Sequence, residues 1–157
     1  MRSTVAVVAY RVCKARHAPG DGSGAARVGG RWNSPGRAVI YCGASQAGAM
    51  LEILAHANRI KLPGAHHVAK FLIPPELQVE TVHSRDVPGW DRAGVDVSRA
   101  IGDAWLAVGA TAVLFVPSAI ARSYEQNIVL NPVHADFARL EMTAPRAIEW
   151  DARLFAP

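Results

Sequence analysis

Three side chains that could bind or transform a charged ligand stand close together in the stretch GGRWNSPGRAVIYCGASQAGAMLEILAH, which runs from Gly29 to His56. They are Arg31, Tyr41 and Glu52. Two glycines precede Arg31, so the backbone there can approach a ligand closely, and the guanidinium can hold a phosphate through two parallel hydrogen bonds. A tight turn with a solvated arginine explains the same residues without a ligand.

Tyr41 lies at the centre of a predicted strand. Alternation along a strand places Ile40 and Cys42 on one side of the sheet and Val39 and Tyr41 on the other. A buried tyrosine needs a hydrogen-bond partner for its hydroxyl, which suits either a site or ordinary core packing.

Glu52 is surrounded by apolar residues in AGAMLEILAHA. Charged residues are seldom buried unless they are paired. The carboxylate therefore either shares a narrow polar stripe of the helix with His56, or points into a cleft where Arg31 would keep it ionised.

Two further candidates follow a predicted buried strand, Thr111 to Pro117. Ser118 comes directly after it in VPSA, where a side chain often lines a site at the sheet edge, although serine is also a frequent helix N-cap. Asn131 lies in EQNIVLNPVH, and an asparagine before a proline is also a natural turn former.

The remaining residues of chemical interest do not form a metal site. The chain has six histidines, but His66 and His67 are adjacent in a predicted strand and point to opposite faces, and the others lack ligand spacing. Cys13 and Cys42 form no CxxC pair, which is typical of buried thiols in a reducing compartment. There is also no dinucleotide fingerprint or phosphate-binding loop, so we expect neither a metal nor a bound cofactor.

The composition is that of a single globular domain of 157 residues. The net charge is +4, and most of the 17 basic residues are arginines, which favours an anionic ligand or an acidic partner. The arginines are scattered rather than gathered in a tract, so nucleic acid is not indicated. No secretion signal and no apolar run of about 20 residues is visible, so we expect a soluble cytoplasmic protein that does not bind membranes.

The pattern of apolar residues and turn formers predicts strands joined by two helices. Ser45 is expected to cap the first helix, and Ser98 and Gly109 to begin and end the second. The predicted strands cover Val5–Val12, Arg37–Cys42, His66–Pro74, Leu77–His83, Thr111–Pro117 and two segments near the end, ARLEMT and RAIEWDARLF, while His17–Gly30 is expected to be a loop. This is an α+β fold with mixed or antiparallel sheets and few helices.

Taken in order, these motifs resemble the RES domain, the toxin half of the RES–Xre toxin–antitoxin modules of bacteria. The family is named for an arginine, a glutamate and a serine. Here GGRWNSPG, VIYCGAS, AMLEILAH and VPSA supply Arg31, Tyr41, Glu52 and Ser118. The segments NIVLNPVHADF and WDARL also fit the family pattern, and the similarity extends from Tyr10 to Leu154.

The resemblance implies that residues 1–157 form one RES domain with a fold like that of ADP-ribosyltransferase toxins. It also implies NAD⁺ as the substrate, either degraded outright or used to transfer ADP-ribose to a target protein. Both reactions break the bond between nicotinamide and ribose. A cognate Xre-type antitoxin that blocks the active site is the implied protein partner.

The chemistry of NAD⁺ assigns roles to the candidates. Nicotinamide leaves through an oxocarbenium-like state, which the Glu52 carboxylate can stabilise. Arg31 and Tyr41 are expected to be catalytic together with Glu52 and also to bind the substrate, Arg31 at the phosphates and Tyr41 by stacking on the nicotinamide ring. Ser118 and Asn131 are the further substrate-binding candidates. Nicotinamide is a good leaving group, so this reaction calls for no metal.

A different class of function fits part of the same evidence. A non-catalytic phosphate or nucleic-acid binding module would use Arg31 and the basic surface, and a purely structural role would use neither. The enzyme requires Glu52 beside Arg31 in a pocket, whereas the binding module requires Glu52 to be remote and the arginines to cluster on one open face.

Overall fold

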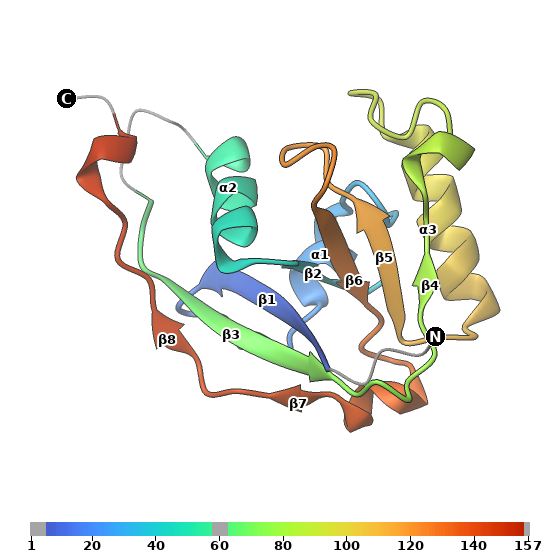
Figure 1. The fold of residues 1–157 in the computed structure, drawn as a ribbon, viewed down its shortest axis with the longest axis horizontal. Coiled ribbons are helices and arrows are strands. Elements are labelled where there is room, and N and C mark those ends of the chain that lie inside the picture. Colours follow the sequence, from blue (N-terminus) through green and yellow to red (C-terminus); the bar gives the residue numbers. More distant parts are fainter. Residues whose placement is uncertain (1–5, 58–62, 156–157) are drawn as a thin grey trace.

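The computed structural model describes residues 6–57 and 63–155, and in this part of the chain one eight-stranded sheet is accompanied by three α-helices (Figure 1). The strands follow the order β4-β5-β6-β2-β1-β3-β7, and β8 also pairs with β3. The pairs are antiparallel except for β4 with β5, which is parallel. The predicted α+β fold with a mixed sheet is therefore confirmed.

The bounds of the strands are β1 Val7–Lys14, β2 Ile40–Gly43, β3 His66–Ile73, β4 Glu80–Thr81, β5 Val113–Pro117, β6 Gln126–Leu130, β7 Glu141–Met142 and β8 Arg146–Ala147. The α-helices are α1 Ser23–Val28, α2 Gln46–His56 and α3 Asp96–Val108. Three short 3-10 helices complete the described elements, η1 Ser84–Asp86, η2 Ala135–Arg139 and η3 Ala152–Leu154.

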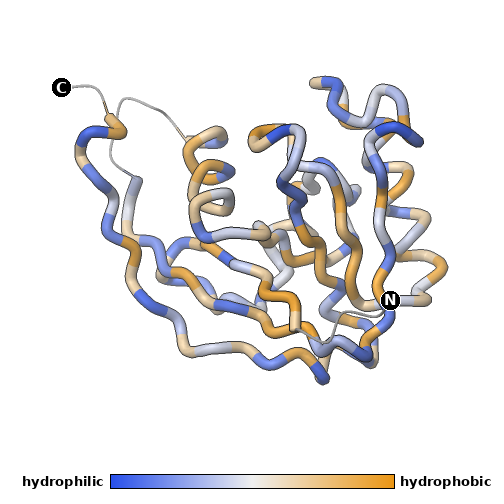
Figure 2. The backbone as a smooth tube through the Cα atoms, viewed as in Figure 1, coloured by the Kyte–Doolittle hydropathy of each residue, from blue (hydrophilic) through white to orange (hydrophobic). Residues whose placement is uncertain are grey.

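Each face of the sheet carries its own hydrophobic core. Ile40 and Cys42 belong to one, and Val39 with the partly buried Tyr41 belongs to the other, so the predicted alternation of β2 is confirmed. The second core also contains three tryptophans, Trp32, Trp90 and Trp105. In Figure 2 the hydrophobic colour runs along β5, whose successive residues belong alternately to the two cores.

Helices α2 and α3 lie beside different strands of the sheet. Helix α2 contacts β1 and β2, while α3 lies beside β4 and β5 and contributes Trp105 to the second core (Figure 1). Ser45 caps α2 by accepting from the Gly48 N–H at 2.9 Å, and Gly109 ends α3 in the left-handed conformation, both as predicted. Cys13 and Cys42 are free and buried, which confirms the prediction of buried thiols.

The segment His17–Gly30 was expected to be a loop but contains α1. Its glycines indicated a loop, but the good helix formers Ala25 and Ala26 follow Gly22, which caps the helix. Asn33 then donates from its side-chain amide to the Ala25 carbonyl at 2.9 Å, which ties the helix to the turn that follows.

Ser98 was expected to cap the second helix, but α3 already begins at Asp96 with Val95 as its N-cap. Ser98 lies inside the first turn, fully buried, and its hydroxyl donates to the Val95 carbonyl at 3.1 Å. Ser98 therefore does lie at the start of the helix, but within the first turn and not at the N-cap, because its hydroxyl donates to the carbonyl of the N-cap residue.

Several predicted strands have different bounds. The first strand extends to Lys14 because it pairs with β3 along its whole length, while its expected start, Val5, lies outside the described residues. The expected strand Leu77–His83 shrinks to β4, since only Glu80 and Thr81 pair with β5 before η1 begins.

The two expected C-terminal strands are also shorter. ARLEMT contributes β7, but RAIEWDARLF is a strand only in β8. The chain then turns into η3, which Asp151 caps by accepting from the Arg153 N–H at 2.9 Å.

Candidate active site

The turn that carries Arg31 is closed by Tyr41. The Tyr41 hydroxyl donates to Asn33 Oδ1 at 2.6 Å and accepts from the Trp32 N–H at 3.0 Å. A Cβ at Gly30 would lie 2.5 Å from that hydroxyl, so the turn requires glycine there. The hydroxyl of Tyr41 therefore has the partners that its burial demands.

Helix α3 holds the same turn from its other side. Arg99 donates from Nε to the Gly30 carbonyl at 2.7 Å. Asp103 accepts from the Ser34 N–H at 3.0 Å and from the Ser34 hydroxyl at 2.5 Å. Reasoning from the sequence missed both residues; their spacing of four marks one polar face of the helix but not the segment that this face meets.

Arg31 points toward backbone rather than toward another side chain. Its Nη1 donates to the carbonyl of Trp90 at 3.2 Å and to that of Arg92 at 3.1 Å. The Trp90 ring stacks on Trp32, with ring centroids 6.1 Å apart. Arg31 thus fixes the segment between η1 and α3 against the turn that carries it.

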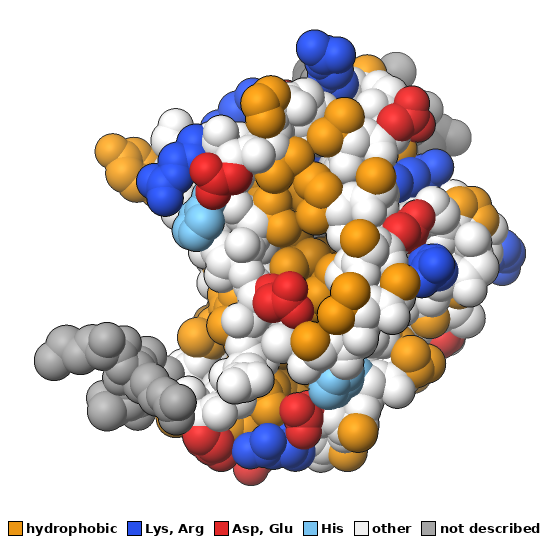
Figure 3. All heavy atoms as spheres, turned by 90° about the vertical axis from the view of Figure 1, so that its right-hand side faces the viewer, with side chains coloured by type: hydrophobic (Ala, Val, Ile, Leu, Met, Phe, Trp, Pro, Cys, Tyr) orange, Lys and Arg blue, Asp and Glu red, His pale blue; other side chains and the backbone are white. Residues whose placement is uncertain are grey.

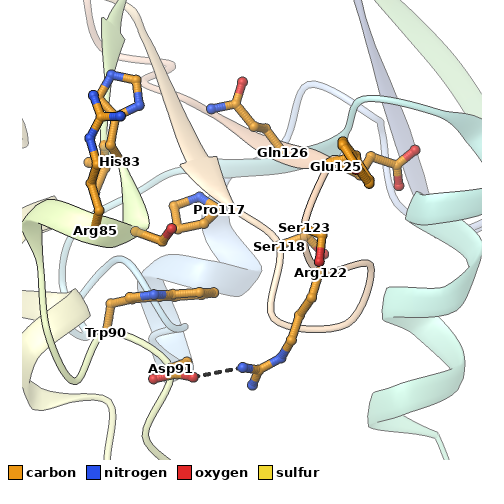
Figure 4. A pocket seen from close by; sticks show the side chains of 13 residues that line it. His83, Arg85, Trp90, Asp91, Pro117, Ser118, Arg122, Ser123, Glu125 and Gln126 are labelled. Carbon is orange, nitrogen blue, oxygen red and sulfur yellow. Dashed lines mark hydrogen bonds and ion pairs between the residues drawn. The ribbon is translucent and has the colours of Figure 1, made fainter.

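That segment forms one wall of a pocket of about 550 Å³. The lining residues are 82–85 and 90–91 on one side and 117–118 and 122–126 on the other. Figure 4 shows the flat Trp90 indole below Pro117, and the ion pair between Arg122 and Asp91 at 2.8 Å, which bridges the two walls. The pocket therefore offers an aromatic surface and charged groups of both signs.

Ser118 lies in this pocket and is buried. Its hydroxyl accepts from the N–H groups of Ile120 at 3.3 Å and Ala121 at 2.9 Å. Ser118 thus lines the pocket at the sheet edge. The alternative role of helix N-cap is wrong, because a loop follows Ser118 and the hydroxyl holds the start of that loop between β5 and β6.

Glu52 extends from α2 to β6. Asn127 donates from Nδ2 to Glu52 Oε1 at 2.7 Å, and His56 Nε2 lies 4.0 Å from Oε2. Asn127 is paired with Gly43 of β2, and paired residues project toward the same face of the sheet. Tyr41, two residues before Gly43 in the strand, also projects toward that face. Glu52 thus shares a face of the sheet with Tyr41, and it also shares the helical stripe with His56.

The structure does not bring every candidate together. Of the five predicted site residues, Ser118 alone lines the pocket. Arg31 holds its wall through the Trp90 carbonyl, and Glu52 is bonded to Asn127, which directly follows the lining residue Gln126. Asn131 lies past the other end of β6, about 13 Å along the strand from Asn127. There its Oδ1 accepts from the Val133 N–H at 3.2 Å, which is the turn role that its sequence also suggested.

Burial and local charge set the protonation of two groups near the site. Burial raises the pKa of the Tyr41 hydroxyl well above its ordinary value, against a smaller opposing effect of the bond from Trp32 N–H. The hydrogen bond from Arg122 lowers the pKa of Asp91. Near neutral pH Tyr41 is therefore a neutral donor and the Arg122–Asp91 pair is charged.

Residues 6–57 and 63–155 contain no group of three His, Cys, Asp or Glu side chains placed to hold a metal ion. Within these same ranges, none of the helices has both the length and the apolar character that crossing a membrane requires.

The family model of the RES domain matches residues 8–151 of the chain. The chain therefore belongs to the RES domain family.

Curated relatives agree with this assignment. The chain is 34% identical over 138 residues to the Prs ADP-ribosylating toxin of Sphingobium sp. (strain YBL2), which covers 85% of each chain. It is 32% identical over 144 residues to Toxin Res of Photorhabdus laumondii, covering 89% of this chain and 91% of the relative.

A solved structure shares the fold. The M. tuberculosis MbcT-MbcA toxin–antitoxin complex contains a chain that matches with a TM-score of 0.72 and 21% identity, covering 91% of this chain and 84% of that one. This likeness confirms the expected α+β fold.

Proposed function

We propose that this chain is the toxin of a toxin–antitoxin module and that it breaks the nicotinamide–ribose bond of NAD⁺. The observation that carries the proposal is the carboxylate of Glu52, which Asn127 holds on the sheet face of Tyr41, one residue along β6 from the pocket-lining Gln126. The name of the relative from Sphingobium, an ADP-ribosylating toxin, supports this chemistry because NAD⁺ is a donor of ADP-ribose.

In the proposed reaction the bond between ribose C1′ and the nicotinamide nitrogen breaks, and its electron pair neutralises the pyridinium ring. Positive charge then develops on the ribose, as in glycoside hydrolysis. A carboxylate that is already oriented stabilises this charge without having to reorganise. The amide of Asn127 gives Glu52 that fixed orientation.

The other candidates take supporting roles. Arg31 uses two of its five N–H groups on the carbonyls of Trp90 and Arg92, and the remaining donors suit the pyrophosphate. Trp90 presents an aromatic surface to a planar ring in the pocket. Stacking of Tyr41 on nicotinamide and contact of Ser118 or Asn131 with the substrate stay predictions.

The same pocket is the proposed target of an antitoxin. An Xre-type partner that covers it would exclude NAD⁺, and the match to a chain of a solved toxin–antitoxin complex supports a partner of this kind. We propose that the free toxin acts in the cytoplasm by lowering NAD⁺ or by modifying a target protein.

The alternative of a non-catalytic binding module fits less well. It requires arginines gathered on one open face, but on the side of the molecule shown in Figure 3 the described Lys and Arg side chains are interspersed with Asp and Glu. The carboxylate of Glu52 lies on the sheet face of Tyr41 but is bonded to Asn127, while Arg31 donates to the carbonyls of Trp90 and Arg92, so the arrangement of the charged surface and not a Glu52–Arg31 contact separates the two functions.

The direct test is release of nicotinamide from NAD⁺ by the purified protein, followed by chromatography. Wild-type protein should release nicotinamide, and its expression alone should slow growth and deplete cellular NAD⁺. Co-expression of the cognate antitoxin should abolish both effects. Absence of nicotinamide release, together with normal growth and normal NAD⁺, would reject the proposed function.

A further inference from the structure

A second carboxylate, that of Glu125, lies against the same helix as Glu52. Glu125 is half-buried, lines the pocket, and accepts from the Ser45 hydroxyl at 2.7 Å. Its other oxygen lies against Gly48, where a Cβ would overlap it. The glycine in the first turn of α2 thus makes room for this carboxylate.

Glu52 and Glu125 both lie along the contact between α2 and the chain at the start of β6, which we call the seam. Gly48, which Glu125 covers, lies four residues, about 6 Å, before Glu52 along α2. On the other side of the seam Glu125 lies two residues before Asn127, the partner of Glu52, and such residues project toward the same side of an extended chain. Figure 4 shows Glu125 on the α2 side of the pocket, opposite Trp90 and Asp91.

We propose that Glu125 is the base that receives the proton of the ADP-ribosyl acceptor, and that this acceptor is a neutral hydroxyl, either water or a protein side chain. The inference rests on the proposed cleavage of NAD⁺. The C1′–N bond breaks with its electron pair passing to nicotinamide, the acceptor oxygen forms a bond to C1′, and the acceptor proton moves to Glu125 and then to solvent.

The charges around the seam favour this class of acceptor. A neutral hydroxyl must lose a proton as it attacks, and a carboxylate within hydrogen-bond reach can take it. An anionic acceptor such as inorganic phosphate needs no base and would be repelled by two carboxylates. The nearby Arg122 is paired with Asp91 at 2.8 Å and faces the opposite wall.

A purely structural role for Glu125 makes a different prediction. In that case the residue only ties the N-terminus of α2 to the loop before β6 through Ser45. Glu125→Gln keeps an oxygen that accepts from Ser45 but cannot take a proton. Comparing Glu125→Gln with Glu125→Ala therefore separates the two roles.

The experiment measures nicotinamide release by wild type, Glu125→Gln, Glu125→Ala and the control Glu149→Gln, an exposed glutamate outside the pocket. Both Glu125 variants should lose about 100-fold in rate while Glu149→Gln matches wild type. Sodium azide, an anionic nucleophile that carries no proton to remove, should raise the rate of Glu125→Ala at least about tenfold and yield an azide adduct. Azide should not rescue Glu52→Gln.

The products identify the acceptor. Free ADP-ribose in buffer indicates water, and label joined to protein through a hydroxylamine-resistant oxygen linkage indicates a protein hydroxyl. A phosphorylated ADP-ribose as the main product in phosphate buffer would overturn the acceptor class. Wild-type rates in Glu125→Gln, or no rescue of Glu125→Ala by azide, would overturn the role of Glu125. Either result leaves NAD⁺ cleavage standing, whereas an inactive wild-type protein rejects the proposed function itself.

Discussion

Asn127 donates from Nδ2 to Oε1 of Glu52 at 2.7 Å and so joins β6 to α2 across the seam beside the pocket. Asn127 is itself fixed by its strand, because it pairs with Gly43 on one side and Val116 on the other. The orientation of the proposed catalytic carboxylate therefore depends on the central sheet, and not on its own helix alone.

Replacing Asn127 by leucine tests this dependence. The change removes the donor while keeping a side chain of similar size, so Glu52 loses its fixed orientation. A hydrogen bond to a charged group contributes about 1.5–3 kcal/mol, so we expect kcat to fall roughly 10- to 100-fold with less change in KM. A melting curve checks the fold, and an unchanged kcat would show that Asn127 does not orient Glu52.

Arg31→Ala should weaken NAD⁺ binding more than it slows turnover. The phosphates carry their charge before and after cleavage, so their contacts are equally strong in the ground and transition states. Loss of one charged contact predicts a rise in KM of about tenfold or more. Arg146→Ala, an exposed arginine of β8, is the control.

Arg31→Ala should also alter the environment of Trp90, whose carbonyl loses its donor. The near-ultraviolet circular dichroism of the stacked Trp32–Trp90 pair reports this change. An unchanged tryptophan signal would show that Arg31 does not hold the pocket wall in solution.

Glycines at two helical positions should respond in opposite directions to alanine. A Cβ at Gly102 would overlap the backbone carbonyl of Trp32, so Gly102→Ala has to move α3 away from the turn that carries Arg31. We expect Gly102→Ala to lower the free energy of unfolding by about 1–3 kcal/mol. Gly24 in α1 has open space around its Cβ position, so Gly24→Ala should raise that free energy by about 0.4–1 kcal/mol. Urea unfolding measures both, and equal effects would contradict the close approach of α3.

The elements predicted best from the sequence are those whose signals are local. The period of a strand placed Tyr41 and Ile40 on opposite faces, and Ser45 marked the start of α2 because its capping partner is three residues away. The helix α1 was missed because its glycines outweighed a short run of helix formers.

The site was predictable only in part, for a physical reason. The residue types of Arg31, Glu52 and Ser118 indicated candidate site residues, but the partners of Arg31 and Glu52 are distant in the chain. Arg31 donates to backbone carbonyls 59 and 61 residues away. Every residue has a backbone carbonyl, so the sequence does not show which of them will accept a hydrogen bond. Trp90 and Glu125 were missed for the same reason, since only the folded sheet brings them to the pocket.

Stability should fall at alkaline pH because protonated groups are buried. Burial raises the pKa of the Cys42 thiol to about 12, and it raises the pKa values of Cys13 and Tyr41 as well. In the unfolded chain these groups ionise from about pH 8.5 for cysteine and about pH 10 for tyrosine. The unfolded state then binds fewer protons than the folded state, so stability is complete below about pH 8.5 and decreases as the pH rises toward 12.

Urea unfolding under reducing conditions, at a series of pH values from about 7 to about 10, measures this decrease. Each fully buried group contributes at most about 1.4 kcal/mol per pH unit. Cys42→Ala should be less stable at neutral pH but should show a shallower decrease at alkaline pH. Identical slopes for wild type and Cys42→Ala would contradict the effect of burial on this thiol.

The decisive variant for the mechanism is Glu52→Gln. Glutamine keeps the size of the side chain and an oxygen for the Asn127 donor, but it removes the negative charge. If that charge acts on the oxocarbenium-like state, it matters more there than in the bound ground state, so turnover should drop far more than NAD⁺ affinity. Loss of one such electrostatic group costs about 10²–10³ in rate, or about 3–4 kcal/mol. Single-turnover release of nicotinamide gives the chemical step, calorimetry gives the affinity, and a melting curve confirms that the variant is folded. A folded Glu52→Gln protein that cleaves NAD⁺ at the wild-type rate would exclude Glu52 as the catalytic carboxylate.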